Sequence, residues 1–92
     1  MSLLFSPFKI RQVELKNRIV MAPTGTGFGN VGGTASDKTM NFYARRALGG
    51  VGMIILETTT VDPSGLISKT RLRIDDDRFI EGLSILARKI KA

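Results

Sequence analysis

Cysteine and histidine are both absent from this sequence, and Tyr43 is its only tyrosine. Without cysteine, disulfides and cysteine-based metal or cluster sites are excluded within these residues. Without histidine, the chain lacks the most common general base and the most common zinc ligand. We therefore expect no catalytic residue and no metal ligand here, so that the proton chemistry of any enzyme containing this chain comes from other residues.

Basic residues are in excess, with a net charge of +6 and a pI near 10.3, yet they form no single basic face. They are spread from Lys9 to Lys91 without interleaved aromatic residues, which favours ordinary solvated charge over a nucleic-acid interface. The apolar runs are far shorter than the roughly twenty residues that span a bilayer. The opening residues have no basic segment ahead of an apolar stretch, so they are not typical of a secretory signal. We expect a cytoplasmic protein that binds neither nucleic acid nor a membrane.

The apolar pattern predicts a hairpin followed by buried strands. Hydrophobic residues make up 42% of the chain and charged residues 24%, which is a globular composition. Residues 8–15 alternate partly between apolar and polar, with a change of phase at Arg11-Gln12 that predicts two short paired strands. The continuous apolar runs at 19–22 and 53–56 are typical of strands in a parallel sheet. Pro23 has no N–H to donate and should end the first of these strands.

Two helices are predicted from apolar residues that recur at helical spacing. The first covers residues 37–48, with Ser36 or Asp37 as its N-cap. The second covers residues 76–91, with acidic residues at its start and basic residues at its end that complement the helix dipole. The stretch before the second helix, residues 58–74, is expected to be irregular.

The order of elements is therefore hairpin, strand, helix, strand, helix, which is typical of the α/β class. Two parallel strands with helices on one side leave the second face of the sheet without cover, although short apolar strands require cover on both faces. We expect a domain that is incomplete as it stands. We expect the second face of the sheet to be covered by further barrel sequence or by self-association with a second copy.

A glycine-rich loop between the first strand and the first helix contains a literal G-x-G-x-x-G pattern from Gly27 to Gly32. With Glu57 at the end of the next strand, the pattern is that of a dinucleotide-binding motif in a small Rossmann-type module. The spacing disagrees, because several residues separate the strand from the first glycine and the last glycine from the helix. The other local interpretation is a flexible surface connection, although the loop leaves the carboxyl end of a strand, where barrels and open sheets bind their ligands.

Several longer segments resemble one family. The opening segment at 4–8, the segment Leu15–Pro23, and the segments at 43–47 and 49–57 resemble the beginning of old yellow enzymes and NADH:flavin oxidoreductases, a group that includes 2-enoate and 2,4-dienoyl-CoA reductases. The resemblance covers nearly the whole chain in the right order and spacing. It implies the first two βα units of a TIM (β/α)8 barrel, preceded by an N-terminal β-hairpin that closes the bottom of the barrel.

The resemblance also implies an FMN site at the carboxyl ends of the strands. By position it assigns cofactor contacts, mostly through backbone groups, to Ala22, Pro23, Thr24, Gly25 and Thr58. Many members of the family carry Cys or Thr where Gly25 stands, and that side chain tunes the reduction potential of the flavin. Glycine has no such side chain, so any tuning must come from the backbone or from a neighbouring threonine.

The activity that the resemblance implies is hydride transfer from NAD(P)H to FMN and then to an electron-poor alkene or an enoyl thioester. Members polarise the substrate with a His/His or His/Asn pair, usually with a tyrosine proton donor, and none of these residues lies in this chain at a matching place. The chain alone is therefore expected to be inactive. FAD and an iron–sulfur cluster are possible only in sequence outside these residues. The alternatives are the Rossmann-type module and a non-catalytic barrel fragment.

A few residues also have a structural interpretation. The segment Lys16-Asn17-Arg18 is interpreted as local packing at the end of a barrel. Glu57 is expected to pair with a basic residue or to cap backbone groups, and Tyr43 to pack in the core. Thr26 and Phe28 are candidates for lining a substrate pocket.

Overall fold

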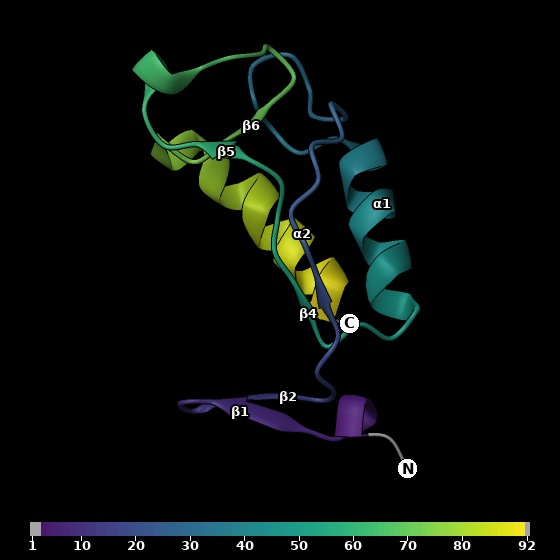
Figure 1. Ribbon diagram of the computed structural model, residues 1–92. Coiled ribbons are helices and arrows are strands. Elements are labelled where there is room, and N and C mark those ends of the chain that lie inside the picture. Colours follow the sequence, from purple (N-terminus) through teal and green to yellow (C-terminus); the bar gives the residue numbers. More distant parts are fainter. Residues whose placement is uncertain (1–2, 92) are drawn as a thin grey trace.

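The computed structural model describes residues 3–91, and Figure 1 shows a hairpin set apart from a pair of strands and two helices. The hairpin lies at the end of the strand pair from which the strands start. The longer loops gather at the opposite end. The molecule therefore has two distinct ends along the direction of its parallel strands.

The hairpin follows a single 3-10 turn, η1 (Leu3–Phe5), and coincides with the predicted range. Its strands β1 (Phe8–Ile10) and β2 (Val13–Leu15) are antiparallel. Arg11 lies at the change of phase and adopts a left-handed conformation with φ 52°. The Arg18 N–H donates to the Leu4 carbonyl over 2.9 Å, so the chain leaving the hairpin is fastened to the chain entering it.

The two apolar runs form a parallel pair, β3 (Val20–Met21) and β4 (Met53–Ile54). Both strands are shorter than the predicted ranges 19–22 and 53–56. The pairing ends soon after the Ile55 N–H donates to the Met21 carbonyl, because Pro23 offers no N–H with which to continue the ladder.

The first helix, α1 (Asp37–Leu48), has the predicted bounds, and Ser36 is its N-cap because its hydroxyl accepts the Thr39 N–H over 3.0 Å. The second helix is α2 (Ile80–Lys91), which starts later than the predicted 76. It is preceded by a 3-10 turn, η3 (Asp77–Phe79). The Asp76 carboxylate caps this turn by accepting the Arg78 N–H over 3.0 Å.

The prediction that residues 58–74 are irregular is wrong. They contain β5 (Thr59–Thr60), a 3-10 turn η2 (Pro63–Gly65) and β6 (Leu72–Arg73). β5 and β6 are parallel, and the Ile74 N–H extends their pairing by donating to the Thr60 carbonyl over 2.9 Å. Strands of two residues leave no readable alternation, so only the folded backbone shows this pairing.

The two faces of the β3–β4 pair have different surroundings. Met21, Ile54 and Leu56 pack against the core residues of the helices, which are Met40, Tyr43 and Leu86. On the other face, Val20, Met53 and Ile55 are 45%, 36% and 42% exposed. Within residues 3–91 the helices thus cover only one face of the sheet, as the order of elements predicted.

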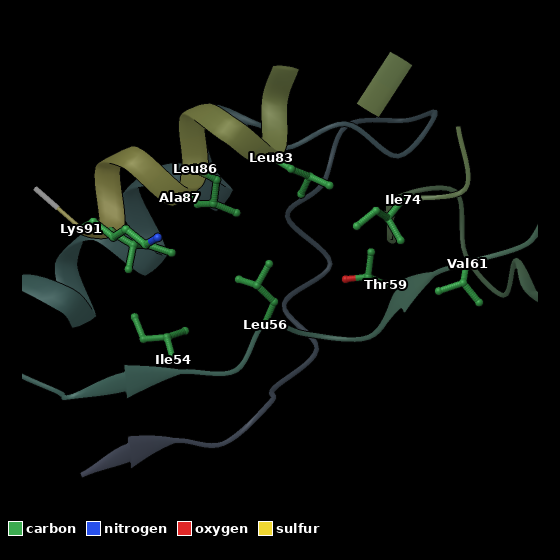
Figure 2. A pocket seen from close by; sticks show the side chains of 10 residues that line it. Ile54, Leu56, Thr59, Val61, Ile74, Leu83, Leu86, Ala87 and Lys91 are labelled. Carbon is green, nitrogen blue, oxygen red and sulfur yellow. The ribbon is translucent and has the colours of Figure 1, made fainter. Parts of the chain in front are cut away.

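An apolar groove of about 370 Å³ lies between α2 and the β4–β5 segment. Figure 2 shows Leu86 and Ala87 of the helix directed toward Ile54 and Leu56 of the strand segment. Within the described residues, β4 pairs with β3 alone, so its other edge borders this groove. The lining is almost wholly apolar, which makes the groove a packing surface and not a site for polar chemistry.

Candidate functional site

The predicted cofactor residues lie at one end of the parallel pair. Ala22, Pro23, Thr24 and Gly25 follow β3, and Thr58 lies beyond the carboxyl end of β4. Because β3 and β4 are parallel, the two segments leave the sheet at the same edge (Figure 1). All five residues are exposed. The structure thus brings them to one open surface.

The backbone of this surface can accept a ligand. The N–H groups of Thr24, Gly25 and Thr26 donate no hydrogen bond to any group within residues 3–91. A Cβ built on Gly25 would meet nothing within 4 Å, so there is open space beside this residue. Exposed N–H donors beside an open surface suit a planar ring that carries carbonyl and ring-nitrogen acceptors, and the isoalloxazine of FMN is such a ring.

A buried hydrogen-bond network lies directly behind this surface. Glu57, at the end of the second apolar run, is only 4% exposed. Its Oε1 accepts the hydroxyl of Tyr43 over 2.9 Å and the hydroxyl of Thr26 over 2.8 Å. The Glu57 N–H in turn donates to the Tyr43 hydroxyl oxygen over 3.1 Å. Helix α1, the end of β4 and the loop after β3 are therefore joined by one carboxylate.

The expectation for Glu57 is corrected by this geometry. Its carboxylate forms no ion pair and caps no backbone group within residues 3–91, because two hydroxyl groups supply its donors. Tyr43 does pack in the core, as predicted, but it also serves the network through its hydroxyl. Burial raises the pKa of Tyr43 to about 12, so its hydroxyl stays protonated and continues to donate.

The glycine-rich loop does not have the geometry of a dinucleotide-binding motif. A side chain at Gly29 would collide with the backbone carbonyl of Thr70, so this glycine permits close approach of the protein backbone and not of a pyrophosphate. The Gly32 N–H donates to the Lys69 carbonyl over 3.2 Å, and the Gly33 carbonyl accepts the Arg73 N–H over 3.0 Å. The loop is thereby held against the segment before and within β6, and the Rossmann interpretation is wrong.

The basic residues near β6 have two different environments. Arg73 forms a bidentate ion pair with Asp75 at 2.9 and 2.7 Å, and its guanidinium lies 5.1 Å from the ring centre of Phe79. This guanidinium lowers the pKa of the Asp75 carboxyl. In contrast, the buried Nε of Arg71 has no partner within the described residues.

Sequence reasoning did not single out Arg71, because the basic residues were interpreted together as ordinary solvated charge. Arg71 lines a cavity of about 200 Å³ at the carboxyl end of the sheet, together with Gly25, Thr26 and Glu57. No sequence signal marked it, since the cavity forms only when the loop after β3 meets the segment before β6.

The amino end of the strand pair is closed by Asn17, as the packing interpretation predicted. Its side chain donates to the Gly50 carbonyl over 2.6 Å and accepts the Ile19 N–H over 3.0 Å. A Cβ on Gly52 would lie 2.5 Å from both the carbonyl oxygen and the side-chain oxygen of Asn17. These contacts join the hairpin exit to the turn before β4.

Residues 3–91 contain neither a cluster of metal ligands nor a helix that could span a membrane. No group of three or more His, Cys, Asp or Glu side chains is placed to hold a metal ion. No helix in this part of the chain combines the length and the apolar character needed to cross a membrane.

Comparison with known proteins places this geometry in a family. The sequence profile of the NADH:flavin oxidoreductase / NADH oxidase family matches residues 3–92. An NADH oxidase of Thermoanaerobacter brockii is 42% identical over 88 residues, and an NADPH dehydrogenase of Bacillus licheniformis is 43% identical over 89 residues. These matches cover 95% and 96% of this chain but only 14% and 26% of the two relatives.

A solved structure gives the same result for the fold. The old yellow enzyme from Pichia sp. AKU4542 superposes with a TM-score of 0.87 at 29% identity. The match covers 97% of this chain and 23% of that one. The chain thus corresponds to a minor part of each protein that it resembles.

Proposed function

Because the chain belongs to the NADH:flavin oxidoreductase / NADH oxidase family, we propose that it forms the opening strands of an FMN-binding (β/α)8 barrel. In this proposal the whole protein oxidises NAD(P)H and reduces an activated C=C bond. The observation that carries the proposal is the open surface at the carboxyl ends of β3 and β4, where unpaired N–H groups follow β3. Barrel enzymes build their active sites at this end of the strands.

The residues of this chain bind and orient the cofactor. The backbone N–H groups of Thr24, Gly25 and Thr26 are placed to donate to acceptors of the flavin ring, while Ala22, Pro23 and Thr58 bound the same surface. When bound, FMN supplies the chemistry by taking a hydride from NAD(P)H and passing it to the acceptor. Gly25 offers no side chain to the ring, so the local electrostatics there come from backbone dipoles.

Tyr43 is excluded as the proton donor to a substrate. Its side chain is fully buried, its hydroxyl already donates to Glu57, and its pKa is about 12. We therefore propose that the acid and the substrate-polarising pair belong to residues outside this chain. An electron-poor alkene or an enoyl thioester is the proposed substrate class.

The uncovered face of the strand pair indicates what the chain packs against. The exposed Val20, Met53 and Ile55 form an apolar face, and the groove of Figure 2 is a second apolar surface at the other edge of β4. Parallel strands are normally buried on both faces. We propose that further barrel sequence covers these surfaces, and that the chain self-associates when expressed without it. Light scattering of the isolated chain tests this, since a well-folded monomer would contradict it.

The function is tested on the full-length product of the gene that encodes this chain. We expect the purified protein to carry flavin with the absorption spectrum of bound FMN, and to oxidise NADH or NADPH faster when an electron-poor alkene is added. Oxygen alone serves as the control acceptor. A protein that binds no flavin contradicts the proposal, whereas flavin binding without alkene reduction contradicts only the substrate class. The chain of residues 1–92 assayed in parallel is expected to be inactive.

A further inference from the structure

Thr26 lies in a segment, Gly25 to Gly27, in which it is the only residue with a side chain. Its neighbours are Gly25 and Gly27, and a Cβ on either glycine would meet nothing within 4 Å. Glycine loses more conformational freedom on ordering than any other residue, so this segment needs a specific anchor to adopt one conformation. From Gly25 to Gly27, the Thr26 hydroxyl makes the only side-chain hydrogen bonds with the rest of the described chain.

The anchor is the carboxylate behind the surface. The Thr26 hydroxyl donates to Glu57 over 2.8 Å and accepts the Phe28 N–H over 3.2 Å. Glu57 itself is held by the hydroxyl of Tyr43, which belongs to α1 and is completely buried. A rigid helix is thereby connected to the glycine-rich backbone in two hydrogen-bonded steps.

The position of this connection has a consequence for the ligand surface. The backbone N–H groups left unpaired beside the open surface belong to Thr24, Gly25 and Thr26, and the last of these is the anchored residue. A hydrogen bond to a buried carboxylate is stronger than one between neutral groups. It therefore holds the three N–H groups in place before a ligand arrives, which reduces the entropy lost on binding.

We propose that Glu57 is a positioning residue, which holds the flavin-binding backbone at Thr24 to Thr26 in its binding conformation through the Thr26 hydroxyl. The inference rests on the proposed FMN site and adds to it a residue that does not touch the cofactor. It also explains why a threonine stands between two glycines, since the hydroxyl supplies the restraint that the glycines lack.

Four substitutions separate positioning from general stability. Thr26→Val keeps the shape and removes the hydroxyl, whereas Thr26→Ser keeps the hydroxyl. Glu57→Gln retains an oxygen that can accept both hydroxyl groups but removes the charge, so it should weaken FMN binding, though less than Thr26→Val does. Thr34→Val is the matched control, because this hydroxyl lies in the same loop but hydrogen-bonds to Asn30 and not to Glu57.

The measurements use the full-length product of the gene and have two independent readouts. In Thr26→Val, we expect FMN to bind about tenfold more weakly, the effect of losing one hydrogen bond to a charged group. We also expect faster amide hydrogen exchange over residues 24–28 in the FMN-free protein, and a changed flavin absorption spectrum in the loaded protein. Thr26→Ser and Thr34→Val should remain close to the unsubstituted protein in all three measurements, and Glu57→Gln should fall between them and Thr26→Val.

The outcomes distinguish this inference from the proposed function. If the unsubstituted protein binds FMN and Thr26→Val leaves affinity, spectrum and exchange unchanged, the positioning role is wrong and the FMN site stands. If Thr34→Val weakens FMN binding as much as Thr26→Val, the effect is general loosening of the loop and the inference is again wrong. If the unsubstituted protein binds no FMN, the proposed function fails and this inference fails with it.

Discussion

The two ends of the β3–β4 pair differ in how many of their polar groups are hydrogen-bonded within the chain. At the amino end, Asn17 hydrogen-bonds to Gly50 and Ile19, and its close contact with Gly52 leaves no space for a side chain at that glycine. At the carboxyl end, Thr24 and Gly25 keep unpaired N–H groups on an exposed surface. The amino end is thus fixed by hydrogen bonds within the chain, whereas the carboxyl end leaves backbone donors unpaired.

The largest effect on stability is expected from adding a side chain at Gly52, where it would collide with Asn17. Gly52→Ala would place a methyl group against the Asn17 carbonyl, and relieving that overlap should cost about 2–3 kcal/mol of unfolding free energy. Denaturant unfolding measures the loss. Gly65→Ala is the matched control, because a Cβ there meets nothing within 4 Å and stability should stay within about 0.5 kcal/mol. Equal effects of the two substitutions would mean that the amino end is not tightly packed.

A smaller loss is expected behind the carboxyl end. Tyr43→Phe removes one donor to the Glu57 carboxylate and leaves the Glu57 N–H without its acceptor, at a cost of about 1–3 kcal/mol. In the unsubstituted chain, the folded pKa of about 12 for Tyr43 exceeds the ordinary tyrosine value of 10.0. The corresponding stability is therefore fully present below pH 10 and is lost as the pH rises through 12.

Tyr43 is the only tyrosine, so phenolate absorbance of the isolated chain reports it alone. Its titration should have a midpoint near 12 in the folded chain and near 10 in denaturant. A midpoint near 10 in both states would contradict the buried network.

Lowering the pH should destabilise the carboxyl end of the strand pair before the amino end. The pKa of Asp75 is lowered from 3.8 by its bond to Arg73, so its contribution to stability is present above pH 3.8 and is lost as the pH falls through the lowered value. The contacts of Asn17 involve no titratable group. In a pH series of hydrogen exchange, we expect protection at Gly33 and Arg73 to decrease before protection at Ile19, and Asp75→Asn to remove this dependence. Simultaneous loss at both ends would contradict the assignment.

The smallest effect on stability is expected at the open surface itself. Gly25→Thr adds a side chain into empty space and should change the unfolding free energy by less than about 0.5 kcal/mol. In the flavin-loaded full-length protein the same change should shift the reduction potential, because the new hydroxyl lies beside the ring. Gly65→Thr, in η2, should leave the potential unchanged. A potential that is insensitive to Gly25→Thr would argue against contact at this position.

Prediction from sequence succeeded where a pattern repeats over several residues. Helix α1 has the predicted bounds because its apolar spacing and its Ser36 cap agree. The hairpin succeeded for a similar reason, since the change of phase at Arg11 marks a left-handed turn. The pairing of β5 with β6 was missed because two-residue strands carry no periodicity. A cytoplasmic location stays a prediction from the sequence.

The candidate site was predicted less completely. Its exposed residues follow from their place after strands and from the resemblance to a family, and the structure brings them to one edge. The role of Glu57 was missed because its partners, Tyr43 and Thr26, are 14 and 31 residues away and are joined only when α1 packs on the sheet.

By itself, the sequence determined the family, the α/β order of elements and the absence of any histidine or cysteine to do chemistry. These properties depend on local patterns and on composition, which are present before the chain folds. Only the tertiary structure decided which donors remain unpaired and which carboxylate holds the loop. The pairing of a polar group depends on what meets it in space, and for Glu57, Asn17 and the glycine loop those partners are distant in the chain.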